Sequence, residues 1–356
     1  MTPAHIAAAA LVCAVAAWLA LALLLRSGLA QRIALDRANA RSLHQGAVPR
    51  VGGLVVIGIT VVVGLLAATG LTVVAGMAGT LMLLGWADDR YGLPVSVRLT
   101  AHLISASAIS VLLLPAAPVW GWLLLALALA WAMNLYNFMD GADGLAGGMA
   151  VFGFGAYAVA GFSADVFGLA VLSASAAGAA VGFLPHNLPP ARLFMGDAGS
   201  VPLGFLAGAL GWQGVARGLW PAWFPVLAFS PFIVDATVTL VRRLLAREAV
   251  WKAHRSHYYQ RLVLGGWSHR RLALAQWAVM AAAGASALMA LDGPAARQSA
   301  ILVTWVLAYG AIGFAIDRRY PRSPDKHGAA LRYTELHNNN RAPNAAAGRP
   351  SSRSTP

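Results

Sequence analysis

Aspartates recur in three short polar segments, each next to a long apolar run of the chain. The first segment contains Asp88 and Asp89, the second Asp140 and Asp143, and the third Asp197. Carboxylates at membrane depth are costly and usually functional. Carboxylate and amide oxygens are the protein ligands that Mg²⁺ prefers, and the ion keeps several waters and substrate phosphates. The three segments together therefore predict an Mg²⁺ site, with Mn²⁺ as the alternative metal.

Each acidic segment also has a simpler structural interpretation. Asp88 and Asp89 can end a helix in solvent, because one acidic pair is a weak motif. The Asn, Asp and Gly residues from Asn137 to Asp143 favour turns. Asp197 can cap the helix that follows it. A cap and a metal ligand are compatible roles, so these alternatives stay open at the level of sequence.

A basic segment, 251–261, mixes cationic, imidazole and aromatic side chains. The fork of an Arg side chain fits phosphate oxygens, so this segment predicts a clamp for a diphosphate. The alternative is a cytoplasmic anchor with interfacial tyrosines. A zinc site at His254 and His257 lacks a third ligand at the usual spacing. A second polar loop, 36–53, ends in two glycines that would let main-chain amides approach phosphate, or it is only a positively charged loop.

The elements that hold these segments are apolar. Of the 356 residues, 59% are hydrophobic and only 11% are charged, whereas soluble domains carry about 25% charged residues. Because so few charges cannot cover a globular surface, lipid must cover most of the protein. We predict an all-α, polytopic membrane bundle of about 11 helices, each near the ~20 residues that span a bilayer. The predicted spans are 5–25, 51–69, 71–87, 100–117, 119–137, 148–163, 166–184, 199–216, 221–241, 271–291 and 299–316.

The distribution of charge gives the orientation. With these spans, all of the 26 Lys and Arg residues except Arg217 and Arg297 fall on one side of the membrane. Basic loops stay in the cytoplasm, so the amino terminus is predicted outside and the carboxyl terminus inside. The acidic and basic segments then share the cytoplasmic face. The net charge of +13 therefore reports membrane orientation, and no nucleic-acid partner is expected.

Two domains of unequal kind follow from the same pattern. Residues 1–316 are the predicted membrane-embedded domain, with its polar site in cytoplasmic loops. Residues 317–356 form a basic tail rich in Asn, Arg, Pro and Ser, a composition typical of disordered segments. The single cysteine, Cys13, lies in the first apolar run, which excludes a disulfide framework.

In combination, these segments resemble the polyprenyl-phosphate N-acetylhexosamine-1-phosphate transferase family. The adjacent aspartates match, and the family pattern Asn-x-x-Asn-Phe-x-Asp-Gly-x-Asp-Gly-Leu-Ala is present at 134–146. Its Pro-Ala-x-x-Phe-Met-Gly-Asp-x-Gly-Ser pattern is present at 190–200. The run His-Arg-x-His-Tyr-x-Gln-Arg-Leu at 254–262 looks most like the branch that starts O-antigen units.

The resemblance implies a multi-pass enzyme of the bacterial inner membrane. It would transfer an amino-sugar 1-phosphate from a UDP-N-acetyl sugar to undecaprenyl phosphate, release UMP, and start O-antigen or another envelope polysaccharide. The sugar stays open among GlcNAc, GalNAc and the deoxy-amino sugars FucNAc and QuiNAc. The oligomeric state stays open too, with a homodimer as one alternative.

The resemblance also implies roles for single residues. Asp197 and Asn137 match the family's Mg²⁺ ligands. The candidate catalytic residues are Asp88, Asp89, Asp140 and Asp143. The candidate substrate-binding residues are Asn134, Arg98, Arg192, His254, Arg255, His257, Arg41, Ser42, His44 and Arg50. The chain departs from the peptidoglycan branch after Asp89, where that branch has a lysine a few positions on; we expect Arg98 to supply this cation.

Two other protein classes share single features with this sequence. An aspartate-rich membrane prenyltransferase needs two Asp-x-x-Asp pairs, and the chain has one, from Asp140 to Asp143. A transporter places polar groups at mid-membrane in broken helices. The strongest candidate for such a group is Asp235, which sits near the cytoplasmic end of its predicted span and has helix packing as its alternative role.

Overall fold

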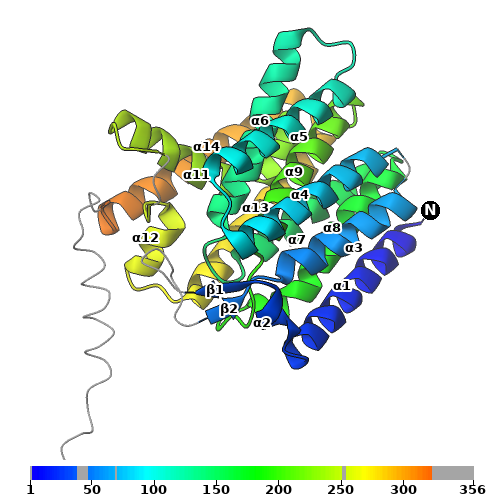
Figure 1. The fold of residues 1–356 in the computed structure, drawn as a ribbon. Helices are drawn as coiled ribbons and strands as arrows, with labels where there is room; N and C mark the ends of the chain where they lie inside the picture. The colour runs from blue at the N-terminus through cyan, green and yellow to red at the C-terminus, as the bar shows by residue number, and fades with distance from the viewer. Residues whose placement is uncertain (1, 38–46, 69, 251–253, 323–356) are drawn as a thin grey trace, which may run out of the picture.

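Long apolar helices make up nearly all of the protein, as the sequence predicts. The computed structural model describes residues 2–37, 47–68, 70–250 and 254–322, and Figure 1 shows them as a bundle of roughly aligned helices. The first half comprises α1 (Pro3–Arg26), α2 (Leu29–Ile33), β1 (Leu35–Arg37), β2 (Ala47–Pro49), α3 (Gly52–Leu66), α4 (Thr72–Tyr91), α5 (Val95–Leu113) and α6 (Val119–Met139). The second half comprises α7 (Leu145–Ser163), α8 (Phe167–Asn187), α9 (Asp197–Ala216), α10 (Trp223–Ala228), α11 (Ser230–Leu245), α12 (Tyr258–Leu264), α13 (His269–Leu291) and α14 (Ala295–Arg319).

The predicted membrane spans coincide with helices. Of the described helices, seven are long and apolar enough to cross a bilayer, namely α1, α5, α6, α7, α8, α13 and α14, and α3 is a shorter apolar helix. These findings confirm a polytopic helical membrane protein. The count of eleven spans and the outside position of the amino terminus stay predictions.

One predicted span is not a single helix. The segment 221–241 divides into α10 and α11 at Phe229, directly before Ser230 and Pro231. Proline lacks the N–H that would continue the helix hydrogen bonding. The Ser230 hydroxyl donates to the carbonyl of Leu227 at 2.7 Å, so a side chain adds a hydrogen bond to the main chain at the break.

The centre of the bundle is formed by α7, α8 and α9, in which most residues are buried. Their sequences are rich in Ala, Gly and Ser. Small side chains let helix backbones approach closely, which is how helices associate in a membrane. The peripheral helices α1 and α14 bury few or no residues. The centre therefore provides a rigid support for the polar loops at its ends.

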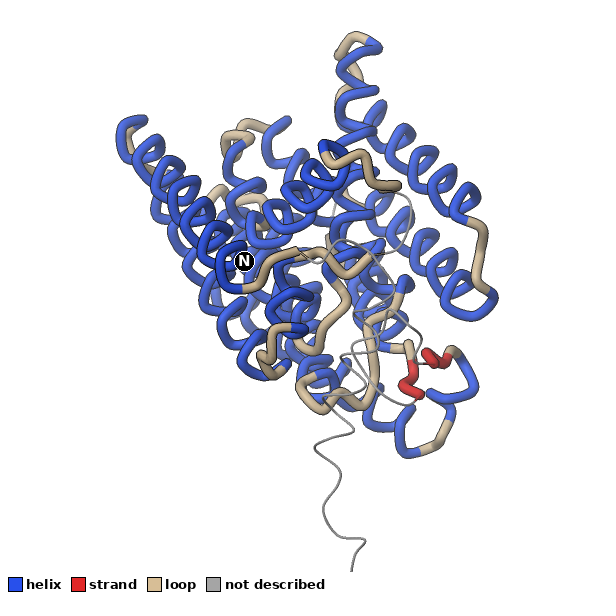
Figure 2. Tube along the Cα trace, turned by 90° about the vertical axis from the view of Figure 1, so that its left-hand side faces the viewer, coloured by secondary structure: helices blue, strands red, loops and turns tan. Residues whose placement is uncertain are grey.

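A two-stranded hairpin closes one end of the bundle. Strands β1 and β2 pair antiparallel, with Asp36 opposite Val48, and Figure 2 shows them in red at that end. Directly after β2, Arg50 pairs in a parallel bridge with Phe194, so the hairpin continues into the loop that precedes α9. This pairing brings Arg50 to the start of α9.

The fold leads to a test of orientation. In a Cys13→Ala background, Ser42→Cys and Ser256→Cys should resist an impermeant maleimide in intact cells, because both loops are predicted to be cytoplasmic. Ala116→Cys, in the exposed loop between α5 and α6, should react without lysis and serves as the control. Ready labelling of either serine position in intact cells would contradict the topology.

Candidate active site

Asp197 lies at the start of α9. The residue before it, Gly196, has φ +71° and ψ 174°, a backbone region that is essentially restricted to glycine. One Asp197 oxygen, Oδ1, accepts a hydrogen bond of 2.8 Å from Nδ2 of Asn137. The other, Oδ2, is 3.4 Å from Nη1 of Arg98. Nδ2 of Asn137 also donates to the Ser200 hydroxyl at 3.0 Å, so the two predicted metal ligands are in contact.

Two glycines let the first turn of α9 sit against its neighbours. A methyl group at Gly85 in α4 would overlap the main-chain carbonyl of Asp197, and one at Gly53 in α3 would overlap the main chain of Gly199. No side chain separates these backbones. The position of the Asp197 carboxylate is therefore fixed by direct contact between main chains.

Asp89 ties the hairpin to α9. Its side chain is fully buried, and Oδ1 is 3.2 Å from Nη1 of Arg50. Oδ2 accepts a hydrogen bond of 3.1 Å from the main-chain N–H of Ala198. Arg50 also forms an ion pair of 2.9 Å with Asp36. Charge-assisted bonds of this kind are the strong ones, so Asp89 holds the position of the α9 start as well as contributing charge.

Asp88 and Arg98 form the neighbouring pair. Oδ2 of Asp88 lies 2.8 Å from Nη1 of Arg98, and Oδ1 accepts a bond of 2.6 Å from the N–H of Leu93. Because Arg98 also reaches Asp197, it bridges α4 and α9. The predicted replacement cation is thus placed between two of the predicted acidic residues.

Asp140 joins the same cluster from the end of α6. It interacts electrostatically with Asp197, Asp89 and Arg50, and it accepts a hydrogen bond from the N–H of Gly196. Loss of solvent raises the pKa of Asp140 well above its usual range, and the carboxylates of Asp197 and Asp89 raise it further. Crowded carboxylates with little water favour binding of a cation.

The donor set fits Mg²⁺ held partly by substrate. Among the described residues, no three His, Cys, Asp or Glu side chains converge closely enough to hold a metal alone. Mg²⁺ in phosphate-transferring enzymes commonly uses one or two carboxylates plus waters and substrate phosphates. Asp197 supplies a carboxylate, and a half-turn of the Asn137 amide would present its oxygen in place of the nitrogen.

Other predicted residues lie beside the cluster. Asp143, before α7, accepts a bond of 3.4 Å from the N–H of Ala191 and lies 3.5 Å from His269. Arg192 contacts Nδ1 of His186 at 2.9 Å. These contacts fix the loop between α8 and α9, and none of them reaches Asp197.

Asn134 lies one turn deeper in α6 than Asn137. It donates to the carbonyl of Ala130 at 2.7 Å and lies 3.4 Å from Nδ1 of His102. Three further predicted substrate-binding residues, Arg41, Ser42 and His44, lie outside the described residues, so their roles stay predictions.

The basic segment is anchored by Asp235. This buried carboxylate lies 3.2 Å from Nδ1 of His257 and accepts main-chain bonds of 2.9 and 3.0 Å from Tyr258 and Tyr259. These contacts favour the packing interpretation of Asp235. The hydroxyl of Tyr259 donates to the carbonyl of Phe138 at 3.0 Å, which places the segment next to the end of α6.

Comparison with known proteins identifies the family. Residues 71–214 match the model of glycosyl transferase family 4. A probable undecaprenyl-phosphate N-acetylglucosaminyl 1-phosphate transferase of Bacillus subtilis is 31% identical over 67% of this chain and 72% of that protein. The chain belongs to glycosyl transferase family 4. The matched residues include all four carboxylates of the cluster, Asp88, Asp89, Asp140 and Asp197.

Further relatives carry related names. A decaprenyl-phosphate N-acetylglucosaminephosphotransferase of Mycolicibacterium smegmatis is 30% identical over 71% of this chain and 74% of its own. A phospho-N-acetylmuramoyl-pentapeptide-transferase of a Geobacillus species is 32% identical over 44% of this chain and 47% of its own. The matched family is one of glycosyl transferases. Membership in it favours neither the prenyltransferase nor the transporter interpretation.

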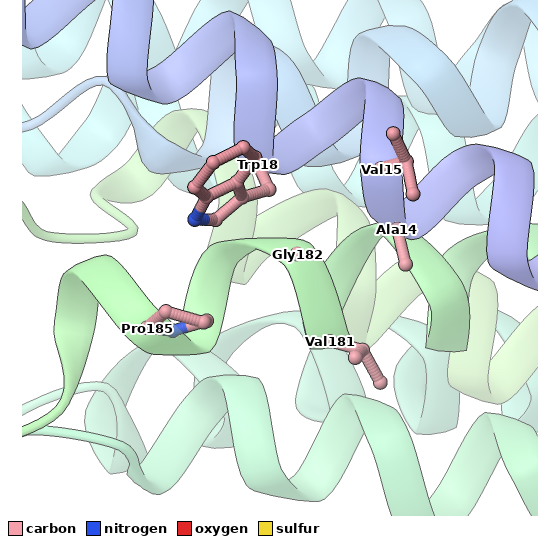
Figure 3. Close-up of a pocket in the computed structure, with 6 residues that line it drawn as sticks. All are labelled: Ala14, Val15, Trp18, Val181, Gly182 and Pro185. Atoms are coloured by element: carbon pink, nitrogen blue, oxygen red, sulfur yellow. The ribbon is translucent and has the colours of Figure 1, made fainter.

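An apolar groove lies away from this site. It is formed between α1 and α8, as Figure 3 shows. Its lining residues are Ala14, Val15, Trp18, Val181, Gly182 and Pro185. No predicted site residue lines it. Its surroundings suit lipid contact, so it is not the site of the polar chemistry.

Sequence reasoning missed three partners of the predicted site residues. Asp36 binds Arg50, Ser200 binds Asn137, and His269 lies near Asp143. Ser200 ends the matched motif that contains Asp197, so proximity in sequence was an available signal. Asp36 lies in the same polar loop as Arg50, so proximity in sequence was a signal there too. His269 is distant in sequence from Asp143, and only the folded structure brings these two together.

The glycine contact gives a specific prediction. Gly85→Ala should lower kcat about 100-fold, because a shift near 1 Å in a catalytic group costs about that much. Gly76→Ala, on the same helix with open space around the added methyl, is the matched control and should keep parental kinetics. Equal activity of the two purified variants would show that main-chain contact with α4 does not position Asp197.

Proposed function

We propose that the protein transfers an N-acetylhexosamine 1-phosphate, or a deoxy-amino sugar 1-phosphate, from a UDP-sugar to undecaprenyl phosphate and releases UMP. Support comes from the family and from the names of its relatives, which act on polyprenyl phosphates. We place this reaction at the bacterial inner membrane, as the first membrane step of O-antigen or another envelope polysaccharide.

The observation that carries the proposal is the convergence of oppositely charged side chains from separate helices. Asp197 and Asn137 are in contact, and Arg98 bridges Asp197 to Asp88. Arg50 lies against Asp89 at the same helix start. Transfer of a phosphoryl group needs mainly positioning and electrostatic stabilisation. A cluster of carboxylates flanked by two guanidinium groups supplies both.

The proposed reaction is one displacement. A phosphate oxygen of the lipid forms a bond to the β-phosphorus of the UDP-sugar. The bond from that phosphorus to the oxygen shared with the α-phosphorus breaks, and UMP leaves with the electron pair. Because the second pKa of a phosphate monoester is about 6, the nucleophile is largely ionised at neutral pH. A strong protein base is not required.

Asp197 and Asn137 would hold Mg²⁺, which neutralises charge on a bound diphosphate. Arg98 and Arg50 are placed to attract phosphate oxygens, since guanidinium groups bind them through paired N–H donors. Asp88 bonds Arg98 and the Leu93 N–H, so the geometry favours Asp88 as the residue that orients Arg98. Its alternative role is to complete deprotonation of the lipid phosphate.

The identity of the sugar rests on names of relatives alone. Two of them are described as N-acetylglucosamine transferases, which makes UDP-N-acetylglucosamine the first substrate to assay. A panel that adds UDP-GalNAc and the UDP forms of FucNAc and QuiNAc, with undecaprenyl phosphate as acceptor, decides among the sugars.

Asp197→Asn tests the proposed metal ligand. The substitution keeps the shape of the side chain and removes its charge, so kcat should fall about 100-fold or more while the protein still folds. Asp165→Asn is the matched control, because Asp165 is exposed and its left-handed backbone, φ 58°, suits Asn. Near-parental turnover of Asp197→Asn across an Mg²⁺ titration would contradict the metal assignment.

Arg255→Ala tests the proposed diphosphate clamp. Loss of a contact present in both ground and transition states should raise KM for the UDP-sugar about tenfold, with a smaller change in KM for the lipid. A fall in kcat alone would assign Arg255 to charge that develops during transfer.

Arg270→Ala is the control for this variant, because Arg270 is an exposed cation at the start of α13. If the Arg255 and Arg270 variants both keep the parental kcat and KM values, the basic segment is only a membrane anchor and is not part of the active site.

A further inference from the structure

Helix α14 differs from the central helices of the bundle. None of its residues is fully buried, although Ile301, Leu302, Trp305 and Ile316 pack against the core. Hydrogen bonds add to this packing. Trp305 donates to the Ser286 hydroxyl at 2.8 Å, and the hydroxyls of Tyr309 and Ser230 lie 2.7 Å apart. Its apolar surface therefore suits lipid. Its ion pairs with the rest of the protein are at its carboxyl-terminal end. Figure 1 shows this end in orange beside yellow α12.

The first contact of that end is an ion triad. The carboxylate of Asp317 lies 2.7 Å from Arg242 and 2.7 Å from Arg261. The Arg261 side chain is only 6% exposed, and it also donates to the main-chain oxygen of Tyr320. A buried guanidinium that loses its carboxylate is strongly destabilised. Asp317 therefore fixes α12 to α11 and α14 together.

The second contact is a parallel triad. Glu248 lies 2.6 Å from Arg322 and 3.4 Å from Arg243, whose side chain is 2% exposed. Beyond α12, the indole of Trp267 donates to the hydroxyl of Tyr320 at 3.0 Å. Residues 317–322 thus contact the chain both before α12, at Glu248, and after it, at Trp267.

His254 and His257 of the basic segment lie in the chain between Glu248 and Arg261, the residues that these two triads hold. Burial, together with the charges of His257, Arg243 and Arg322, lowers the pKa of His254 to about 3. The His254 and His257 rings lie 4.9 Å apart, with His257 held by Asp235. Arg243 and Arg322, which belong to the second triad, therefore act directly on the electrostatics of the segment.

We propose that Asp317, Tyr320 and Arg322 form a carboxyl-terminal clasp that positions the His254–His257 segment to bind the diphosphate of the UDP-sugar. This inference rests on the proposed function. The three clasp residues act as positioning residues, because each contacts α12 or the loop before it and none is placed at the reacting phosphates. The peripheral helix thereby acquires a role in substrate binding.

The test uses full-length Asp317→Ala and two measurements, steady-state kinetics and the Kd for UDP in Mg²⁺. UDP carries the diphosphate whichever sugar is the substrate. Loss of the carboxylate should weaken UDP binding and raise KM for the UDP-sugar by on the order of tenfold, with kcat and KM for undecaprenyl phosphate near parental values. Asp317→Glu should recover most of the affinity. Asp292→Ala removes an exposed carboxylate at the other end of the α13–α14 pair and should change neither constant.

A second variant covers failure of Asp317→Ala to fold. Glu248→Gln breaks the other triad without altering α14. It should raise the Kd for UDP and the KM for the UDP-sugar. The clasp is refuted if Arg255→Ala weakens UDP binding while the folded Asp317 and Glu248 variants bind as the parent does. If Arg255→Ala is also without effect, the basic segment does not bind diphosphate, and that part of the proposed function fails together with the clasp.

Discussion

The first turn of α9 lies directly against the main chains of α3 and α4, and the proposed site depends on that contact. Gly53 and Gly85 provide the space for it, and Gly196 provides the backbone conformation from which α9 begins. The contact brings Asp197 to Asn137 and brings the N–H of Ala198 to Asp89. Small residues at helix contacts are the usual means of close approach in membranes. Here they fix the relative position of the reactive groups.

Charge balance explains why the cluster suits a cation and a phosphate. Four carboxylates, those of Asp88, Asp89, Asp140 and Asp197, interact with two guanidinium groups. In a site with little water, an excess of like charge is costly unless an opposite charge binds. A divalent cation that arrives with a diphosphate would meet this need, while the arginines meet the phosphate oxygens. The metal and the nucleotide are therefore expected to bind cooperatively.

The sequence predicted most helices and the site motifs because both depend on local patterns. Apolar runs mark membrane depth, yet the helices continue beyond them. Helix α5 begins at Val95 rather than at 100, and α4 runs past 87 to Tyr91. These polar extensions are what carry Arg98, Asp88 and Asp89 to the site. Hydropathy alone could not show this, because it measures burial in lipid and not helix length.

Pairings between distant residues were beyond sequence reasoning. Asp235 binds residues 257–259, and Asp317 binds Arg242 and Arg261. Nothing in the spacing of single residues identifies such partners, because each pairing depends on how helices pack. Family motifs could give the residue types of the site, and the packing of α9, α12 and α14 decided which of them meet.

The central claim is direct displacement at the cluster, with no sugar-phosphate bound to the protein. Exchange of labelled UMP into the UDP-sugar tests it most directly. The account predicts exchange only when Mg²⁺ and undecaprenyl phosphate are both present, because UMP can return to the UDP-sugar only from the lipid-linked product. Exchange in the absence of undecaprenyl phosphate would reveal a covalent intermediate, for example on an aspartate of the cluster, and would contradict the account.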